Sequence, residues 1–303
     1  MSVVIARAAG PARIDIAYER LGDPESPPVL LLMGLGTQML GWPDGFCSAL
    51  AARGVHVIRF DNRDIGLSTH LTDAPMPDVS AALLGDASSA SYRLSDMAAD
   101  TVGLLDSLGL DSVHLVGASM GGMIAQTAAI EHPDRVRSLT SIMSTTGDPS
   151  VGQPTRRALA ALLSPPAATR AEAIDRTVSI VRVIGSPGFD LDEAELRWRT
   201  GLAYDRSNDP VGVARQLVAI AASGDRTTAL RSVSVPTLVL HGADDPLVDV
   251  SGGQATARAI PGAELVVFGG MGHNLPRELW AEIARHIAEL VGRAEAARLI
   301  RPR

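Results

Sequence analysis

Short apolar runs alternate along the chain with longer segments whose apolar residues recur at helical spacing. Seven runs are typical of strands: 14–18, 29–32, 55–60, 113–116, 139–143, 237–241 and 265–268. Helical patterns separate them, among others at 46–53, 94–108 and 119–131. This alternation favours right-handed crossovers and a mostly parallel sheet with helices on both faces, which is an α/β fold.

Two local signals refine the helix at 94–108. Ser95 is expected to cap its start, and Gly109 follows its end. The strand–helix alternation stops between residues 147 and 231, where prolines recur and the apolar spacing stays helical. We therefore expect a core formed by 1–146 and 232–303, with a helical insertion at 147–231 lying over the sheet. The stretch 72–92, rich in Ala, Ser, Asp and Pro, is expected to be irregular.

Composition narrows the class of protein. The 303 residues are 46% hydrophobic and 20% charged, as in ordinary globular proteins. The formal charge is −7 and no basic stripe occurs, which argues against a nucleic-acid binder. Uninterrupted apolar stretches such as 29–33 are far too short to span a membrane, and the first ten residues do not resemble a secretory signal. A cytoplasmic protein is expected. Peripheral membrane contact and the oligomeric state stay open.

Several chemistries are excluded by residue type. The single cysteine, Cys47, cannot form an internal disulfide. All 27 basic residues are arginines, so a Schiff-base lysine and a phosphate-binding P-loop lysine are both excluded. The seven histidines are scattered, without metal-ligand spacing beside cysteines or carboxylates. We predict no metal and no cofactor.

A candidate nucleophile stands in residues 117–121, which read Gly-Ala-Ser-Met-Gly and match the pattern G-x-S-x-G. The pattern alone is weak, but here it lies between a strand and a helix, as a nucleophile elbow requires. Flanking glycines permit the sharp turn that projects the Ser119 hydroxyl above the sheet. The alternative is a plain glycine-rich turn in which Ser119 caps the helix.

A serine nucleophile needs a base, and in this arrangement the acid and the histidine follow it in the chain. Asp244 and Asp245 both lie in the turn beyond the strand at 237–241, where open α/β sheets place their sites. His273 lies in a glycine-rich loop after the last strand and can reach back towards Ser119. The other histidines lie on strand or helix positions typical of packing, or lack a supporting context.

Transition-state stabilisation in such a site needs two backbone amides, one from the residue after the nucleophile and one from a loop after an early strand. Met120 would supply the first. The second is expected from Leu35, with Gly34 and Gly36 giving the backbone room to turn. The alternative at 33–36 is an ordinary glycine-rich turn.

Together these residues resemble the α/β-hydrolase superfamily over nearly the whole chain. Residues 61–68, Asp-Asn-Arg-Asp-Ile-Gly-Leu-Ser, are similar to the family's D-x-R-G-x-G-x-S loop. Segments 41–44 and 261–276 resemble anthracycline methyl esterases and related bacterial lipases and esterases. The resemblance implies an eight-stranded, mostly parallel sheet with a helical cap, and it favours Asp245 as the acid. Met33 stands where many members have histidine, which weakens any assignment to the HGGG-type subfamily.

The resemblance implies hydrolysis of carboxylic esters or thioesters of a small or lipid-like molecule through an acyl-enzyme, without a cofactor. For the substrate pocket we expect Gly34, Trp42, Phe189, Trp198 and Tyr204, the alternative being that the aromatic residues only pack the insertion against the sheet. The same triad would also serve a cofactor-free perhydrolase or haloperoxidase, or a carbon–carbon bond hydrolase. A non-catalytic binding protein is the remaining alternative. Dehalogenases and epoxide hydrolases need a carboxylate nucleophile, which Ser119 disfavours.

Overall fold

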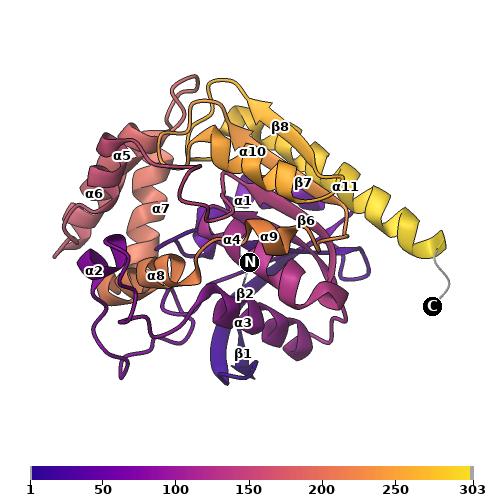
Figure 1. The fold of residues 1–303 in the computed structure, drawn as a ribbon, viewed down its shortest axis with the longest axis horizontal. Coiled ribbons are helices and arrows are strands. Elements are labelled where there is room, and N and C mark those ends of the chain that lie inside the picture. Colours follow the sequence, from indigo (N-terminus) through magenta and orange to yellow (C-terminus); the bar gives the residue numbers. More distant parts are fainter. Residues whose placement is uncertain (1, 301–303) are drawn as a thin grey trace.

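An eight-stranded sheet forms the centre of the structure, a computed structural model that describes residues 2–300 (Figure 1). Its strands lie in the order β1-β2-β4-β3-β5-β6-β7-β8. In chain order they are β1 (Val4–Ala9), β2 (Ile14–Leu21), β3 (Pro28–Leu32), β4 (His56–Phe60), β5 (Val113–Ala118), β6 (Val136–Ile142), β7 (Thr237–Gly242) and β8 (Glu264–Phe268). Six neighbouring strands are parallel, in the sheet order β4, β3, β5, β6, β7 and β8. Strand β2 runs antiparallel to both β4 and β1.

The seven strands expected from the apolar runs are all present, and their centres agree with the prediction. The exception is β1, which was not predicted. Its sequence, VIARAA, has few large apolar residues and no clear alternation. Its place in the sheet comes from pairing with β2, which is tertiary information that a local pattern does not carry.

Helices cover both faces of the sheet. On one face lie α1 (Asp44–Ala51) and the long α11 (Trp280–Ile300), which pack against each other. The other face carries α3 (Leu94–Ser107), α4 (Met120–Glu131) and α10 (Val250–Ala259). Short 3-10 turns complete the connections at η1 (Met39–Gly41), η2 (Pro133–Arg135) and η3 (Arg277–Leu279).

The helix expected at 94–108 is present, but its start is capped differently from the prediction. Ser95 does not cap it, because the helix begins one residue earlier, at Leu94. The carboxylate of Asp96 reaches back to accept the backbone N–H of Arg93 at 2.8 Å, so no hydroxyl cap is required. At the other end Gly109 adopts φ +67°, as a glycine after a helix commonly does.

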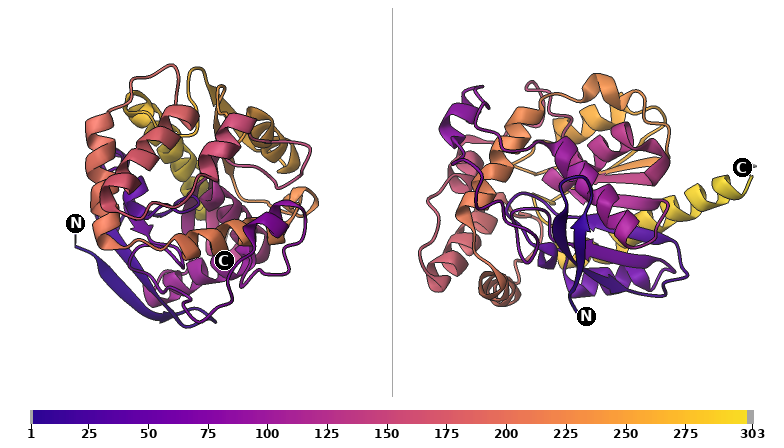
Figure 2. Two further views of the ribbon diagram at one scale, coloured as in Figure 1. Left: turned by 90° about the vertical axis from the view of Figure 1, so that its left-hand side faces the viewer. Right: turned by 90° about the horizontal axis from the view of Figure 1, so that it is seen from below.

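Between β6 and β7 the described structure is helical, in agreement with the loss of strand pattern. This segment contains α5 (Arg156–Leu162), α6 (Arg170–Ile184), α7 (Glu193–Arg206), α8 (Pro210–Ser223) and α9 (Thr227–Leu230). Helices α5 to α8 gather to one side of the sheet, at the left of Figure 1, and face the viewer in the left panel of Figure 2. The stretch expected to be irregular also contains a short helix, α2 (Val79–Leu83), which packs against α8.

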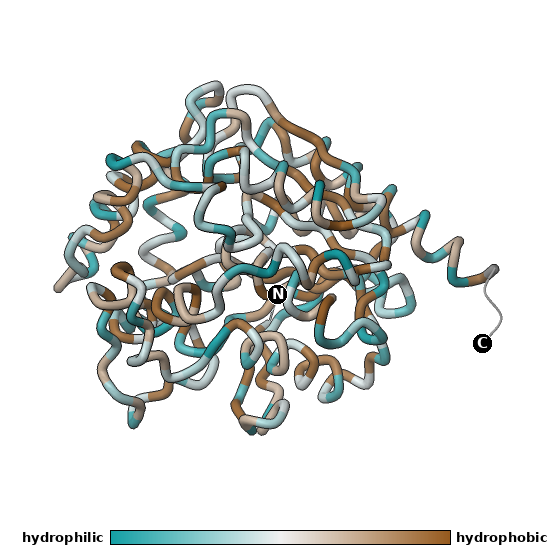
Figure 3. Tube along the Cα trace, in the orientation of Figure 1, coloured by the Kyte–Doolittle hydropathy of each residue, from teal (hydrophilic) through white to brown (hydrophobic). Residues whose placement is uncertain are grey.

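Apolar side chains form a core cluster on each face of the sheet, and the hydropathy-coloured trace has hydrophobic stretches both in the interior and along the helices (Figure 3). Trp42 belongs to this core. It is fully buried and stacks on Phe46 at a ring separation of 5.5 Å. Cys47 lies beside it, and burial raises the pKa of its thiol to about 12, as expected for an inert packing residue. No helix within residues 2–300 combines the length and apolar composition needed to cross a bilayer.

Candidate active site

Ser119 stands at the turn between β5 and α4, with φ 55° and ψ −120°. Such a backbone conformation is strained for a residue with a side chain, and its neighbours must fix it. Two glycines make the turn possible. A Cβ on Gly117 would lie 2.1 Å from the carbonyl oxygen of Gly121, and one on Gly121 would lie 2.2 Å from that of Leu32. The G-x-S-x-G pattern is thus explained by close backbone contacts on both sides of the serine.

Three of the predicted site residues meet at the carboxyl ends of the strands. His273 Nε2 lies 3.0 Å from Ser119 Oγ, and His273 Nδ1 lies 2.7 Å from Asp245 Oδ2. The Asp245 side chain is fully buried, and its other oxygen accepts the backbone N–H groups of Leu247 and Val248, each at 2.9 Å. A carboxylate held in this way is fixed in place and can orient the imidazole.

Asp244, the competing acid, points elsewhere. Its carboxylate accepts the backbone N–H of Gly270 at 2.8 Å, in the loop that leads to His273. The two adjacent aspartates therefore have different partners, one on the imidazole and the other on the loop that carries it. A second histidine, His241, lies behind Asp245 with Nε2 at 2.8 Å from the Val248 carbonyl oxygen, and burial lowers its pKa.

The loop that carries His273 is also held by hydrogen bonds to residues at the end of α6, in the helical segment between β6 and β7. The backbone N–H of His273 donates to the carbonyl of Ile184 at 2.7 Å, and that of Gly272 donates to Ser186 Oγ at 3.0 Å. A Cβ on Gly272 would lie 2.2 Å from the Gly185 carbonyl oxygen, so the two loops approach at backbone distance. The position of His273 thus depends on residues from between β6 and β7.

Residues 34–37 form a tight turn after β3, beside the serine. The N–H of Thr37 donates to the carbonyl of Gly34 at 3.2 Å, and Gly36 adopts φ +64°. A Cβ on Gly34 would lie 3.1 Å from Ser119 Cβ, so this turn contacts the candidate nucleophile directly. Neither Leu35 nor Met120 uses its backbone N–H as a donor to any protein acceptor within the described chain.

The loop after β4 at residues 61–68, which resembles D-x-R-G-x-G-x-S, forms hydrogen bonds to the backbone of Met33 and Met39, on either side of the turn at 34–37. Asp61 is fully buried and accepts the backbone N–H groups of Met39 at 2.7 Å and Leu67 at 3.0 Å. Its carboxylate also pairs with Arg206, at the end of α7, at 2.9 Å. Asn62 Nδ2 donates to the carbonyl of Met33 at 3.1 Å. These residues fix backbone rather than face a substrate.

The aromatic residues expected in a substrate pocket lie in different environments. Trp42 is fully buried in the core, so the expectation that it lines the substrate pocket is wrong. Trp198, on α7, is 65% exposed and lines a surface pocket of about 250 Å³ together with Trp280. Phe189 is half-buried and packs against the core near Gly270, and Tyr204 is half-buried on α7.

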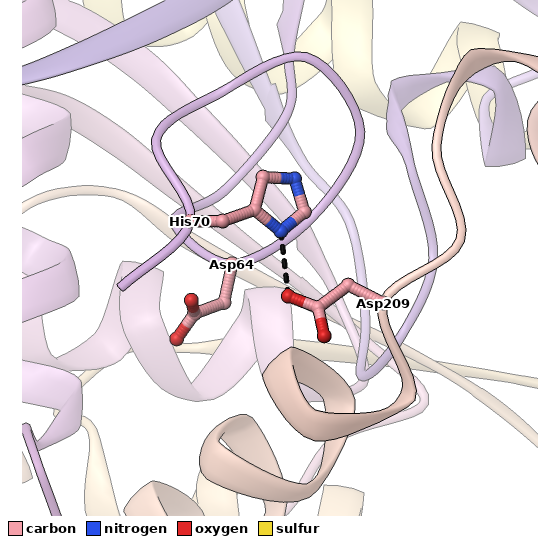
Figure 4. Close-up of side chains that lie close together, drawn as sticks. All are labelled: Asp64, His70 and Asp209. Carbon is pink, nitrogen blue, oxygen red and sulfur yellow. Dashed lines mark hydrogen bonds and ion pairs between the residues drawn. The ribbon is translucent and has the colours of Figure 1, made fainter. Parts of the chain in front are cut away.

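Asp64, His70 and Asp209 come together close enough for their ligand atoms to share a metal ion (Figure 4). The protein itself already occupies these atoms. Both oxygens of Asp64 accept from the Arg215 guanidinium at 2.9 Å, and His70 Nδ1 bonds Asp209 Oδ2 at 2.7 Å. We interpret the cluster as an ion-pair network that joins the loop after β4 to the start of α8.

Comparison with known proteins agrees with the fold. The chain belongs to the alpha/beta hydrolase fold family, whose model matches residues 27–276. It is 31% identical to rhodomycin D methylesterase DauP of Streptomyces sp. strain C5 over 89% of this chain and 92% of the relative. It is also 26% identical to a 2-hydroxymuconate semialdehyde hydrolase of Pseudomonas putida, over 90% and 89% respectively.

A solved structure, a thermophilic esterase from Thermogutta terrifontis with malate bound, matches with a TM-score of 0.68. It is 26% identical and covers 97% of this chain and 99% of its own. The chain is therefore a hydrolase, and the relatives named methylesterases are carboxylic ester hydrolases.

Proposed function

We propose that this hydrolase cleaves a carboxylic ester of a small molecule through an acyl-enzyme formed on Ser119. The observation that carries the proposal is a pair of hydrogen bonds that connects three side chains. His273 Nε2 lies 3.0 Å from Ser119 Oγ, and His273 Nδ1 lies 2.7 Å from Asp245 Oδ2. A serine hydroxyl is a weak nucleophile, and a base at hydrogen-bond distance is what activates it.

The reaction proceeds in two halves. Ser119 Oγ attacks the ester carbonyl carbon as His273 Nε2 takes the hydroxyl proton, which gives a tetrahedral oxyanion. Its collapse breaks the bond to the alkoxy group, which leaves as the alcohol with the proton from His273. A water molecule then gives a proton to His273 and attacks the acyl-enzyme. Collapse of the second oxyanion releases the acid, and the proton returns to Ser119. Throughout, Asp245 holds Nδ1 protonated and stabilises the imidazolium.

The oxyanion would be bound by the backbone N–H groups of Leu35 and Met120. Both lie next to Ser119, one in the turn that contacts it and the other at the first position of α4, and neither donates to another group of the described chain. The amino end of α4, a helix of 12 residues, adds the positive end of its dipole at the same point. One such donor typically contributes about 10²–10³ in rate.

The substrate class follows from the relatives and from the helical segment. Relatives named methylesterases match most of the chain, which supports a methyl or other short-alkoxy ester of a small molecule. Residues 147–231 would act as a cap, because the segment leaves the sheet at the carboxyl end of β6, the edge where Ser119 and His273 lie. No group beyond the protein's own residues is needed for this chemistry.

A carbon–carbon bond hydrolase is the second candidate. The relative from Pseudomonas putida, named a 2-hydroxymuconate semialdehyde hydrolase, favours it, since the match extends over 90% of this chain. The serine, histidine and aspartate would then act on a carbonyl whose leaving group is carbon rather than oxygen.

The test is covalent labelling by a fluorophosphonate together with turnover of p-nitrophenyl and methyl esters of increasing acyl size. Ser119→Ala should abolish labelling and lower kcat by about 10⁶. Ser232→Ala, at an exposed serine, is the matched control and should retain both. A folded wild-type protein that neither labels nor hydrolyses any ester would overturn the proposal. Turnover of 2-hydroxymuconate semialdehyde without ester turnover would select the second candidate.

A further inference from the structure

The peptide group between Leu35 and Gly36 is held at both ends. Its N–H, from Gly36, donates to Gln216 Oε1 at 2.9 Å. Its carbonyl, from Leu35, accepts the Thr37 hydroxyl at 3.2 Å. This peptide is the centre of the turn at 34–37, so its orientation determines how the preceding amide, that of Leu35, faces Ser119.

A turn of this kind can reverse its central peptide. Gly36 has φ +64° and, as glycine, also tolerates negative φ, so its own conformational preference does not select one orientation. A fixed acceptor for the Gly36 N–H does select it. Val213 adds a steric limit, because its Cγ1 lies 3.0 Å from where a Cβ of Gly36 would be.

Gln216 is suited to act as that acceptor. Its side chain is fully buried (0% exposed), and its Nε2 donates to the carbonyl of Arg63 at 2.8 Å. Because an N–H needs the amide oxygen and a carbonyl needs the amide nitrogen, only one orientation of the Gln216 amide satisfies both partners. Reversing either the amide or the peptide would leave buried polar groups without partners, which is costly.

The helix that carries Gln216 is itself fixed to the core. Arg215, the preceding residue on α8, forms two hydrogen bonds to Asp64 at 2.9 Å. At the far end of α8, Ser223 Oγ accepts the backbone N–H of Leu94 at 2.9 Å. The helical segment between β6 and β7 thus reaches the turn beside Ser119 through a rigid connection.

We propose that Gln216 is a positioning residue that orients the Leu35 amide for binding the oxyanion, so that a helix of the inserted segment is part of the transition-state machinery. This inference rests on the proposed esterase function. Gln216 does not touch the substrate. It acts through the Gly36 N–H, and its effect should appear in kcat rather than in KM.

The experiment uses Gln216→Met, which keeps the approximate size of the side chain but removes both the acceptor for the Gly36 N–H and the donor to the Arg63 carbonyl. For Gln216→Met we expect kcat to fall about 10- to 100-fold with KM within about twofold, as for a misplaced catalytic group. The affinity for a trifluoromethyl ketone, which forms an oxyanion on the serine, should fall in parallel.

Ser223→Ala is the matched control, because it removes one hydrogen bond between α8 and the core far from the turn. It should lower the melting temperature while leaving kcat and the inhibitor affinity unchanged. The inference is overturned if folded Gln216→Met keeps wild-type kcat and inhibitor affinity, or if Ser223→Ala loses as much of both. Failure of the proposed function is distinguishable, since the wild-type enzyme would then not label with the fluorophosphonate.

Discussion

Asp244 and Asp245 are adjacent in the chain, yet their carboxylates bind two different parts of the same loop. Asp245 Oδ2 lies 2.7 Å from His273 Nδ1, while Asp244 Oδ2 accepts the Gly270 N–H at 2.8 Å. The difference arises because Asp245 turns inward onto the Leu247 and Val248 amides, whereas Asp244 remains at the surface.

The first prediction uses this pair. Asp245→Asn should lower kcat by about 10³–10⁴, because an amide cannot hold the imidazole in the required tautomer or stabilise its charged form. Asp244→Asn can still accept from Gly270 and should keep kcat within about tenfold. Steady-state kinetics of both variants on one ester checks this. The assignment of the acid would be wrong if Asp244→Asn were the more impaired of the two.

The second prediction concerns the backbone contact under the serine turn. A Cβ on Gly121 would lie 2.2 Å from the Leu32 carbonyl oxygen, which belongs to the central strand and cannot move aside. Gly121→Ala should therefore cost at least about 3 kcal/mol of unfolding free energy or prevent folding. Gly54, with φ +80° and no atom within 4 Å of a Cβ, is the control, and Gly54→Ala should cost about 1 kcal/mol. Equal melting temperatures for the two variants would contradict the prediction.

The third prediction is that the contribution of His70 to the free energy of unfolding is lost at alkaline pH. Burial opposes protonation of His70, but hydrogen bonds to the Gly66 carbonyl and to Asp209 outweigh it and raise its pKa. The stabilisation is fully present below the unfolded pKa of about 6.5 and is lost as pH rises through the folded value. His70→Gln should thus lower the urea unfolding free energy more at pH 5.5 than at pH 9. A loss independent of pH would show that the ion pair contributes nothing.

The fourth prediction is that buried His114, on β5, makes the folded protein less stable in acid. The His114 side chain is 1% exposed, and burial lowers its pKa to about 4 despite the nearby Glu295. The unfolded chain takes up its proton near pH 6.5 and the folded chain only near 4, so stability falls as pH falls between these values. Between pH 7 and 4 the wild-type protein should lose about 3 kcal/mol more than His114→Gln. Parallel pH profiles of the two proteins would contradict this prediction.

The sequence was most informative where chemistry and local pattern coincide. Gly117 and Gly121 around Ser119 lie between a buried strand and a helix, and that context made the serine turn predictable. Strand β1 was not predictable, because its weakly apolar residues are ordered by pairing with β2. The start of α3 at Leu94 was predicted, but its cap was not, since the Asp96 carboxylate, rather than Ser95, accepts the backbone N–H of Arg93.

Side-chain environment was harder to predict than backbone. Trp42 and Trp198 have the same residue type and no distinguishing local signal, yet the first is fully buried and the second is largely exposed. Gln216 gave no signal at all, because a glutamine in a helix is typical of a solvent-exposed position. Only the packing of α8 onto the turn after β3 reveals its two buried hydrogen bonds.

The contacts at Ile184 and Gln216 have a consequence for changing the specificity of this enzyme. Exchanging residues 147–231 for the equivalent segment of a relative is an obvious way to transplant a new substrate preference. Such a chimera would also discard the carbonyl that holds the His273 amide and the side chain that holds the Gly36 amide. With residues 147–231 as the proposed cap and Gln216 as the proposed positioning residue, selectivity and turnover would not be separable in this chain, and a donor segment would have to supply both contacts to give an active hybrid.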